Sequence, residues 1–325
     1  MLIIMFPGMI TGSSTAAVLS AGSIMAPVLA LMGIDAVTSG SIIAMGALLG
    51  MIAPPVNTAA LIICAGIDVP YVGFEGPLAL ITFPLAILFV LLLGYKQARH
   101  MDYEKLKPAL EKQDAIRKQY GVRIYIPLLV LVALMVIFKV LKLGEDIGMP
   151  LMFLISAAVG LFTGKKINVL TAVPEAIRTA APVMGILMGV GMFIEVMTAT
   201  GVRGLVVISC LRLPSTLWLL ACAISIPLFG AVSSYGACSV LGVPFAYIYA
   251  SLLGGNSVVV LAAISLIAAV GDMMPPTALA GLFAAQVTGV EKYTEILKRC
   301  IVPIIILLVY ACFFLANSKL IAGLF

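Results

Sequence analysis

Charged residues are scarce in this sequence: Asp, Glu, Lys and Arg make up 10% of the 325 residues, whereas hydrophobic residues make up 63%. The mean hydropathy is +1.22. A soluble domain of this length needs far more polar surface, so a soluble globular protein is excluded. Several apolar runs reach about 20 residues, the length at which a helix crosses a bilayer. The runs are continuous rather than alternating, so they predict helices and not barrel strands.

Groupings of metal-ligating and catalytic residues are also missing. The single histidine, His100, lies in the most charged segment, and an enzyme would need paired acids or an activated nucleophile, which the sequence does not show. Glu195 and Asp272, acids within predicted spans, are far apart in the sequence. An enzyme is therefore not expected, and a channel is disfavoured because rings of repeated charge are absent. The six cysteines lack metal-ligand spacing, which argues against a zinc site or a disulfide framework: Cys64, Cys210, Cys222, Cys238, Cys300 and Cys312.

The N-terminus lacks the features of a signal peptide. Met1–Met9 is already apolar, with no basic region and no small-residue cleavage site. The segment is typical of the interior of a helix, so we expect that membrane segments are missing before it or that the chain starts late relative to its relatives.

The sequence contains an internal repeat. Pro54-Pro55 and Pro275-Pro276 are separated by 221 positions, and the same separation relates Ser13 to Ser234. Both serines lie in clusters of small polar residues inside apolar runs. Each unit is predicted to contain a short helix, the polar break, a second short helix, a helix broken at Pro-Pro and a closing helix. The helices flanking each polar break have about 10–15 apolar residues, too few to span a membrane but suitable for a re-entrant hairpin.

These features divide the chain into four segments. Residues 1–95 form the first repeat, 96–123 a charged linker, 124–203 a scaffold of transmembrane helices, and 204–325 the second repeat. The expected scaffold spans are Ile124–Leu143, Pro150–Thr163 and Pro174–Ala199. The predicted fold is an all-α integral membrane protein, an inverted-repeat transporter with two re-entrant hairpins and two Pro-Pro-broken helices.

The distribution of basic residues predicts that the repeats are inverted. The linker 96–123 is rich in Lys and Arg and is expected to be cytoplasmic. The loop 67–76 has no Lys or Arg, as an outside loop should. The equivalent loop 288–299 contains Lys292, Lys298 and Arg299. Placing equivalent loops on opposite sides of the membrane is typical of secondary transporters.

The residues around the two breaks suit a hard cation. A proline leaves the carbonyl four residues earlier without its helical partner, which frees the carbonyls of Gly50, Met51, Gly271 and Asp272. Unpaired carbonyls deep in a membrane need a partner, and a sodium ion takes oxygen ligands. Nearby side-chain oxygens could complete two such sites: Ser13, Ser14, Ser233, Ser234, Asn57 and Thr277.

Helices that restart after the breaks direct their positive ends at the middle of the membrane. These ends lie near Thr15, Thr58, Gly236 and Leu279. Such ends favour an anionic group without a buried arginine. We therefore expect a carboxylate-bearing substrate between two sodium sites, bound at Thr15, Thr58, Ser233 and Gly236.

Simpler explanations exist for single features. Small polar residues in membrane helices often allow close packing, and a lone proline often only kinks a helix. Their occurrence twice, at one separation and in inverted loops, favours function. Asp272, beside the second break, could bind a cation, carry a proton or line a cavity as a structural acid. Its counterpart is Met51, so any such role is asymmetric, whereas Glu195 is expected to reach the membrane interface.

With these motifs the chain resembles the large permease subunit (DctM-type) of TRAP transporters, within the wider ion transporter superfamily. The first signature runs from Ile10 to Ala17 and Ala21 to Ile24, and continues in Gly50–Pro55. The second contains Pro275-Pro276, Leu282-Phe283 and Val287–Val290, followed by Pro303. The order and spacing match over nearly the whole chain.

The resemblance implies a sodium-driven elevator in the inner membrane, in which a hairpin-bearing domain slides against a scaffold. It implies a periplasmic substrate-binding protein and a small membrane subunit as partners, and organic acids such as dicarboxylates as substrates. It also implies sodium ligands in each half: Ser13, Ser14, Gly50 and Asn57 in the first, and Ser234, Gly271 and Thr277 in the second.

The chain departs from the family pattern at the second hairpin, Phe229–Gly242, where Tyr235 and Cys238 lie near the tip. We also expect the first scaffold helices of the family to be absent, as in a divergent branch that works without a binding protein or in a truncated gene product that cannot transport alone. A stand-alone carboxylate symporter of the same superfamily, working without a binding protein, is therefore the alternative. The sequence leaves open the substrate, the choice between sodium and protons, and the oligomeric state.

Overall fold

The computed structural model describes residues 1–99, 121–140, 149–163 and 168–325, and within them it contains helices and no strand. The predicted all-α class is confirmed. The chain forms two compact units: unit 1 contains Met1–Asp102 and Val183–Phe325, and unit 2 contains Tyr103–Pro182. Most of the predicted linker 96–123, with His100, lies outside the described residues.

Unit 2 is built on a pair of apolar helices. The short 3-10 helix η3 (Gly121–Tyr125) leads into α9 (Ile126–Val140), which packs against α10 (Met149–Thr163). Ser156 of α10 donates a hydrogen bond of 2.7 Å to the carbonyl of Pro127. α11 (Val169–Ala199) begins in unit 2 and ends in unit 1. Helices therefore occupy the three predicted scaffold spans as far as these are described.

The first part of unit 1 starts with two helices joined at a tight reversal. α1 (Leu2–Thr11) ends at Gly12, and α2 (Ser14–Ala17) runs without interruption into the π-helix η1 (Val18–Gly22) and α3 (Ser23–Leu31). The chain then forms α4 (Ala36–Ile52), α5 (Thr58–Gly66), α6 (Glu75–Phe89), the π-helix η2 (Val90–Gly94) and α7 (Tyr95–Ala98).

The last part of unit 1 repeats this order after α12 (Val202–Leu211) and the 3-10 helix η4 (Ser215–Leu217). α13 (Trp218–Gly230) corresponds to α1. The second arm consists of α14 (Ser234–Ala237), the π-helix η5 (Cys238–Gly242), α15 (Val243–Ala246) and the π-helix η6 (Tyr247–Leu252). α16 (Ser257–Ala269) and the 3-10 helix η7 (Val270–Met273) together correspond to α4. α17 (Leu279–Thr288) corresponds to α5, and α18 (Tyr293–Ala316) corresponds to α6. A short helix, α19 (Ser318–Ala322), follows.

The structure corrects the match between the two polar clusters. Ser13 and Ser233 are the N-caps of α2 and α14, so corresponding serines are 220 positions apart. The pairing of Ser13 with Ser234 was wrong by one residue. The separation returns to 221 at Asp35 and Asn256, the N-caps of α4 and α16. The additional residue of the second half falls in the arm after the tip, where η6 is wound as a π-helix with more residues per turn.

The arms after the tips are longer than predicted. They run as continuous apolar helices over Ser14–Leu31, with 18 residues, and Ser234–Leu252, with 19 residues. Prolines inside these arms do not end them, because Pro27 lies within α3 and Pro244 lies in the first turn of α15. The arms before the tips are short, as predicted, with 10 residues in α1 and 13 in α13.

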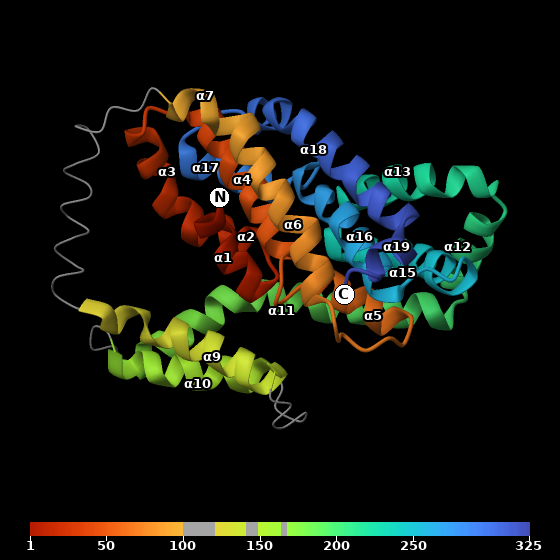
Figure 1. The fold of residues 1–325 in the computed structure, drawn as a ribbon, viewed down its shortest axis with the longest axis horizontal. Coiled ribbons are helices and arrows are strands. Elements are labelled where there is room, and N and C mark those ends of the chain that lie inside the picture. The colour runs from red at the N-terminus through yellow and green to blue at the C-terminus, as the bar shows by residue number, and fades with distance from the viewer. Residues whose placement is uncertain (100–120, 141–148, 164–167) are drawn as a thin grey trace. The chain divides into compact units, whose positions relative to one another are not determined.

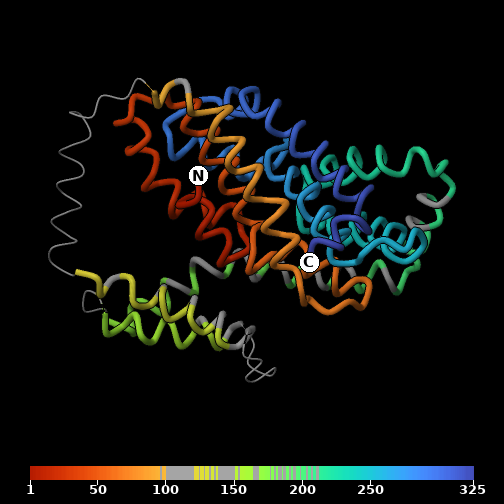
Figure 2. The backbone as a smooth tube through the Cα atoms, viewed as in Figure 1, coloured from red at the N-terminus to blue at the C-terminus, as the bar shows by residue number. Residues whose placement is uncertain are grey.

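The two halves of unit 1 exchange their helices. α5 of the first half packs against η5 and α16 of the second, and α17 of the second half packs against η1 and α4 of the first. The red and orange helices therefore lie side by side with the blue ones in Figures 1 and 2. Residues Thr38–Ile52 of α4 and Val259–Ala269 of α16 are buried on all sides, so the core is shared by both halves.

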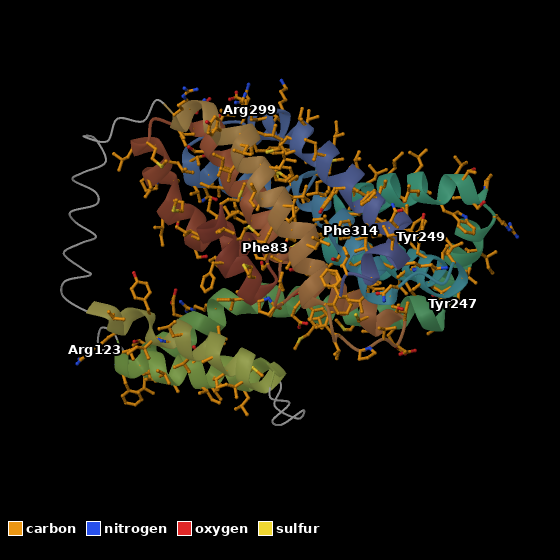
Figure 3. All side chains as sticks on the ribbon, viewed as in Figure 1. Phe83, Arg123, Tyr247, Tyr249, Arg299 and Phe314 are labelled. Atoms are coloured by element: carbon orange, nitrogen blue, oxygen red, sulfur yellow. The ribbon has the colours of Figure 1, made fainter. Side chains whose placement is uncertain are left out.

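The closing helices α6 and α18 run antiparallel. Near the end of α18, the Tyr310 hydroxyl donates a hydrogen bond of 3.1 Å to the carbonyl of Leu80, near the start of α6. Arg299, labelled in Figure 3, lies near the start of α18. It lies close to Asp35, which is hydrogen-bonded to Gln97 just beyond the end of α6 and η2. The loop before α6 and the loop before α18 thus lie at opposite ends of unit 1 (Figure 1).

The outer surface of unit 1 is apolar. On α18, Ile305, Val309 and Phe313 are exposed, while Leu307 and Phe314 are buried. A helix that is apolar on both its buried and its exposed face needs lipid around it. Four helices of the described residues are long and apolar enough to cross a membrane: Ser14–Leu31, Glu75–Gly94, Ser234–Leu252 and Tyr293–Ala316.

Candidate functional site

Each hairpin tip of unit 1 is built on a serine cap. Ser13 Oγ accepts a hydrogen bond of 3.3 Å from Ala16 N–H, and Ser233 Oγ accepts one of 3.1 Å from Gly236 N–H. A serine in extended conformation satisfies an N–H that the first helical turn leaves free, which starts a helix at this point. Gly12 reverses the chain with a left-handed φ of 66°, which a glycine adopts without steric cost.

The segments after the two proline pairs are tied to the hairpins in the same way. In the first half, Val56 N–H donates to the carbonyl of Met9 at 3.2 Å. In the second half, Thr277 N–H donates to the carbonyl of Ala231 at 3.1 Å, and the Thr277 hydroxyl donates to the same oxygen at 2.7 Å. These bonds place each proline pair beside the polar tip of its own half.

Glycine pairs bring the backbones together at both tips. A Cβ added to Gly8 would lie 2.7 Å from the carbonyl carbon of Gly50, and one added to Gly230 would lie 3.0 Å from the Cα of Gly271. Side chains larger than hydrogen are excluded at such contacts. Gly50 and Gly271, both predicted sodium ligands, therefore have a packing role that exists without any ion.

One predicted free carbonyl is already paired. The carbonyl of Gly271 accepts a hydrogen bond of 3.0 Å from Met274 N–H, because η7 tightens into a 3-10 helix and the donor moves one residue nearer. The prediction that Pro275 leaves this oxygen unpaired was therefore wrong. In the first half, α4 stays α-helical to Ile52, and Pro54 and Pro55 cannot donate to the carbonyls of Gly50 and Met51.

Asp272 lies where the two tips meet. Its side chain is 4% exposed, and the Ser14 hydroxyl from the opposite half donates a hydrogen bond to its Oδ2. The Ser234 hydroxyl, from its own half, is a second hydrogen-bond partner. A buried carboxylate needs hydrogen-bond donors or a cation to offset the lost hydration. Within the described residues, no group of three or more His, Cys, Asp and Glu side chains could hold a metal ion.

Tyr235 forms a second contact between the tips. Its hydroxyl donates a hydrogen bond of 2.7 Å to the carbonyl of Gly12 and lies 3.9 Å from the Met51 sulfur. Ser13 is a further hydrogen-bond partner of this hydroxyl. The Tyr235 side chain is 8% exposed. The first tip is therefore held to the second half through Ser14 with Asp272 and through Gly12 and Ser13 with Tyr235.

Asn57 joins the first proline break to the other half. It is fully buried, and its Oδ1 accepts a hydrogen bond of 2.9 Å from Ala60 N–H as the N-cap of α5. Its Nδ2 donates a hydrogen bond of 2.8 Å to Ser265 in the middle of α16. Its main-chain N–H donates to the Tyr71 hydroxyl at 3.2 Å, which in turn donates to the Pro55 carbonyl at 3.1 Å.

The predicted site residues divide into two groups. The structure brings Ser13, Ser14, Ser234 and Asp272 together around Tyr235, while Asn57 and Thr277 lie beside the proline pairs as cap and tether. The predicted substrate residues occupy the first turns of three helices, with Thr58 next to Gly12 and Ser233 acting as a cap. Three cavities, of about 420, 500 and 590 Å³, are lined by other residues, so they do not mark a substrate site at the tips.

Sequence reasoning missed Tyr71, Ser265 and the role of Tyr235. Tyr235 was noticed as a departure at the tip, but only the fold shows that it reaches Gly12 across 223 positions. Ser265 had no signal beyond being a polar residue in an apolar run.

Comparison with known protein families identifies a match over nearly the whole chain. The model of a family described as the DctM component of the tripartite ATP-independent periplasmic transporter matches residues 2–318. No curated protein sequence matches the chain.

Proposed function

The chain belongs to the family of the DctM component of tripartite ATP-independent periplasmic transporters, and from this premise we propose that it carries an organic acid across the membrane, driven by sodium. The observation that carries the proposal is the meeting of both hairpin tips at the buried Asp272. A buried carboxylate needs a partner that offsets its charge. The hydroxyl oxygens around Asp272 are ligands that a hard cation such as sodium takes.

The proposed sodium ligands fall into two sets. One set consists of Asp272 with the hydroxyls of Ser14 and Ser234, which already surround one carboxylate. The other consists of the main-chain carbonyls of Gly50 and Met51 together with oxygens of Ser13 and Asn57. Thr277 and Gly271 have carbonyl and hydroxyl lone pairs left after their internal hydrogen bonds, and these complete the shell in the second half.

The proposed substrate group is a carboxylate at the starts of the helices after the tips. The arms that begin at Ser14 and Ser234 are 18 and 19 residues long, so each carries the partial positive charge of a full helix at its first turn. Thr15, Thr58, Ser233 and Gly236 lie at or beside such first turns and can donate main-chain or hydroxyl hydrogen bonds. A dicarboxylate could engage both tips at once.

The proposed mechanism is an elevator. The antiparallel α6 and α18, and the opposite placement of the loops before them, support an inverted repeat with two re-entrant hairpins and two helices broken at Pro-Pro. Unit 1 contains both tips and both breaks, so it is the proposed moving body, and the helices of unit 2 belong to the proposed scaffold. The proposed location is the inner membrane.

The proposed partners are a periplasmic substrate-binding protein and a small membrane subunit. One observation favours the alternative, a symporter that works alone. At the second tip, Tyr235 and Cys238 depart from the family pattern. Co-purification from native membranes distinguishes the two. Recovery of a soluble periplasmic protein supports the tripartite arrangement, and full uptake activity of the single chain supports the alternative.

Uptake of small radiolabelled carboxylates by proteoliposomes that contain the chain together with its co-purified partners tests the coupling. We expect uptake that requires an inward sodium gradient and is not restored by a pH gradient with choline in place of sodium. Asp272→Asn should abolish it, whereas Asp35→Asn, which removes an acid at the exposed end of α4, should leave it nearly unchanged. Uptake driven equally well by a pH gradient alone would replace sodium with protons as the coupling ion.

A further inference from the structure

We propose that Tyr235 is a positioning residue that couples the two proposed sodium sites, so that an ion bound in one half favours binding in the other. The inference rests on the proposed function, because it concerns the same pair of sites. Tyr235 follows Ser234 directly in the chain, so its backbone belongs to the site at Asp272. Its hydroxyl reaches Met51, which belongs to the site of the first half, and Gly12, which directly precedes Ser13 of that site.

The contacts of Tyr235 leave it little freedom. The hydroxyl donates to the Gly12 carbonyl at 2.7 Å, and the side chain is buried between the two tips. Gly12 in turn lies directly against Thr58, at the start of α5. A displacement at Ser234 is therefore passed through one rigid aromatic ring to Gly12, and from there to the first turn of the helix that follows the first proline pair.

The connection is asymmetric. The residue that corresponds to Tyr235, at the separation of 220 given by the serine caps, is Thr15, whose side chain is half-buried and too short to span between the tips. The residue that corresponds to Asp272 is Met51, and its sulfur contacts the Tyr235 hydroxyl. The first tip therefore contributes Ser14, which donates to the carboxylate of Asp272, and the second tip contributes Tyr235.

Coupling follows from linkage. If sodium at Asp272 fixes Ser14 and Ser234, it also fixes Tyr235 and Gly12, so the ordering of the first-half site is already complete before its ion arrives. The effect is reciprocal for binding. Tyr235→Phe keeps the ring and its packing but leaves the buried Gly12 carbonyl without this donor. We expect the midpoint of the sodium response to rise about tenfold, the factor that corresponds to one buried hydrogen bond.

The chain offers a matched control. Tyr310 also joins the two halves through a hydroxyl bound to a main-chain carbonyl, that of Leu80 at 3.1 Å, but it lies on the closing helices and not at the tips. Tyr310→Phe should lower thermal stability by an amount similar to Tyr235→Phe. It should not change the midpoint or the steepness of the sodium response.

The test uses the purified full chain in lipid nanodiscs, with two measurements on the wild type, Tyr235→Phe and Tyr310→Phe. The first is the thermal midpoint as sodium replaces choline at constant ionic strength. The second is hydrogen exchange, without sodium, in peptides that cover Gly12–Ala17. We expect a Hill coefficient above one in the wild type and near one in Tyr235→Phe. We also expect faster exchange of the first tip in Tyr235→Phe alone.

The two measurements separate the possible failures. If the thermal midpoint of the wild type does not respond specifically to sodium, the sodium assignment is overturned and the coupling with it. Hydrogen exchange then still shows whether Tyr235 holds the first tip. A sodium response that is the same in Tyr235→Phe and wild type overturns the coupling and leaves the sodium assignment standing. Equal changes of the sodium response in both variants would also overturn it, because the effect would then be general loosening.

Discussion

Ser14 of the first half of unit 1 donates a hydrogen bond to Asp272 of the second half, across 258 positions of the sequence. The bond joins the start of α2 to η7, directly before the second proline pair. It brings the only intramembrane acid predicted at a break into contact with the polar tip of the other half. Several measurable consequences follow from this contact and from those around it.

Loss of either serine hydroxyl should weaken sodium binding at Asp272. Ser14→Ala and Ser234→Ala each remove one hydrogen-bond partner of the carboxylate, and we expect each to raise the sodium midpoint about tenfold. Sodium titration of thermal stability measures this. Ser20→Ala is the control, because Ser20 lies in the same arm but is exposed and its hydroxyl donates to the carbonyl of Ala16. An equal effect of Ser20→Ala would refute the site.

Asn57 should contribute more stability than an ordinary helix cap. Asn57→Ala removes the cap of α5 and also leaves Ser265 without its donor, at a combined cost of about 2–4 kcal/mol. Asn256→Ala removes only an exposed cap of α16, at about 1 kcal/mol. Thermal or denaturant unfolding of the two variants gives the comparison.

A double-mutant cycle with Ser265→Ala isolates the bridge between the halves. We expect the effects of Asn57→Ala and Ser265→Ala to be less than additive, because either change removes the same hydrogen bond. Strict additivity would show that the contact carries no energy of its own.

The glycines at the breaks should not tolerate a methyl group. A Cβ on Gly50 would lie 2.7 Å from the Met5 Cα, with backbone atoms that cannot move aside. We expect Gly50→Ala and Gly271→Ala to lower stability by several kcal/mol, about 3 or more, or to prevent folding. Gly185→Ala, at a position with nothing within 4 Å of the added Cβ, should be neutral or slightly stabilising. Yield of monodisperse protein and unfolding midpoints give the readout.

Asp35 should make stability fall in acid. Partial burial raises the pKa of this carboxyl, but the Thr38 N–H, the Gln97 amide, the Thr38 hydroxyl and the nearby Arg299 together hold the pKa below its ordinary value of 3.8. A lowered pKa contributes stability above the unfolded value, and this contribution is lost as pH falls through the folded pKa. The loss should therefore occur below about pH 4.

Asp35→Asn removes this dependence. We expect the variant to be slightly less stable than wild type at neutral pH, by about 1–2 °C because the group is exposed, and this difference in thermal midpoint to shrink as the pH falls below about 4. Thermal midpoints measured in detergent from pH 6 to pH 3 provide the check. A constant difference in thermal midpoint between Asp35→Asn and wild type over this pH range would mean that the carboxylate charge does not contribute to stability.

The sequence predicted the parts of this structure that depend on local chemistry. Gly12 and Ser13 mark the first reversal, Pro54 and Pro55 mark the end of α4, and Leu279 begins α17, because a cap, a missing N–H and a restarted helix leave direct traces in the residues. Asp272 was identified as the acid at the second break for the same reason.

The contacts between the halves were not predictable in this way. Which residue Tyr235 or Asn57 meets depends on how α5 and α17 cross into the opposite half, and no spacing along the chain records it. The one-residue error at Ser234 has a physical cause as well. The π-helix η6 takes up one residue without any sequence signal as clear as a proline.

Labelling of two loops tests the central claim, the inversion of the two halves, most directly. Val72, 71% exposed before α6, and Lys292, exposed before α18, lie in equivalent loops at opposite ends of unit 1. In sealed right-side-out vesicles, a membrane-impermeant maleimide should label Val72→Cys. It should label Lys292→Cys only after permeabilisation, with sites assigned by mass spectrometry against the native cysteines. Labelling of both positions from the same face would contradict the inverted arrangement and the ion sites built on it.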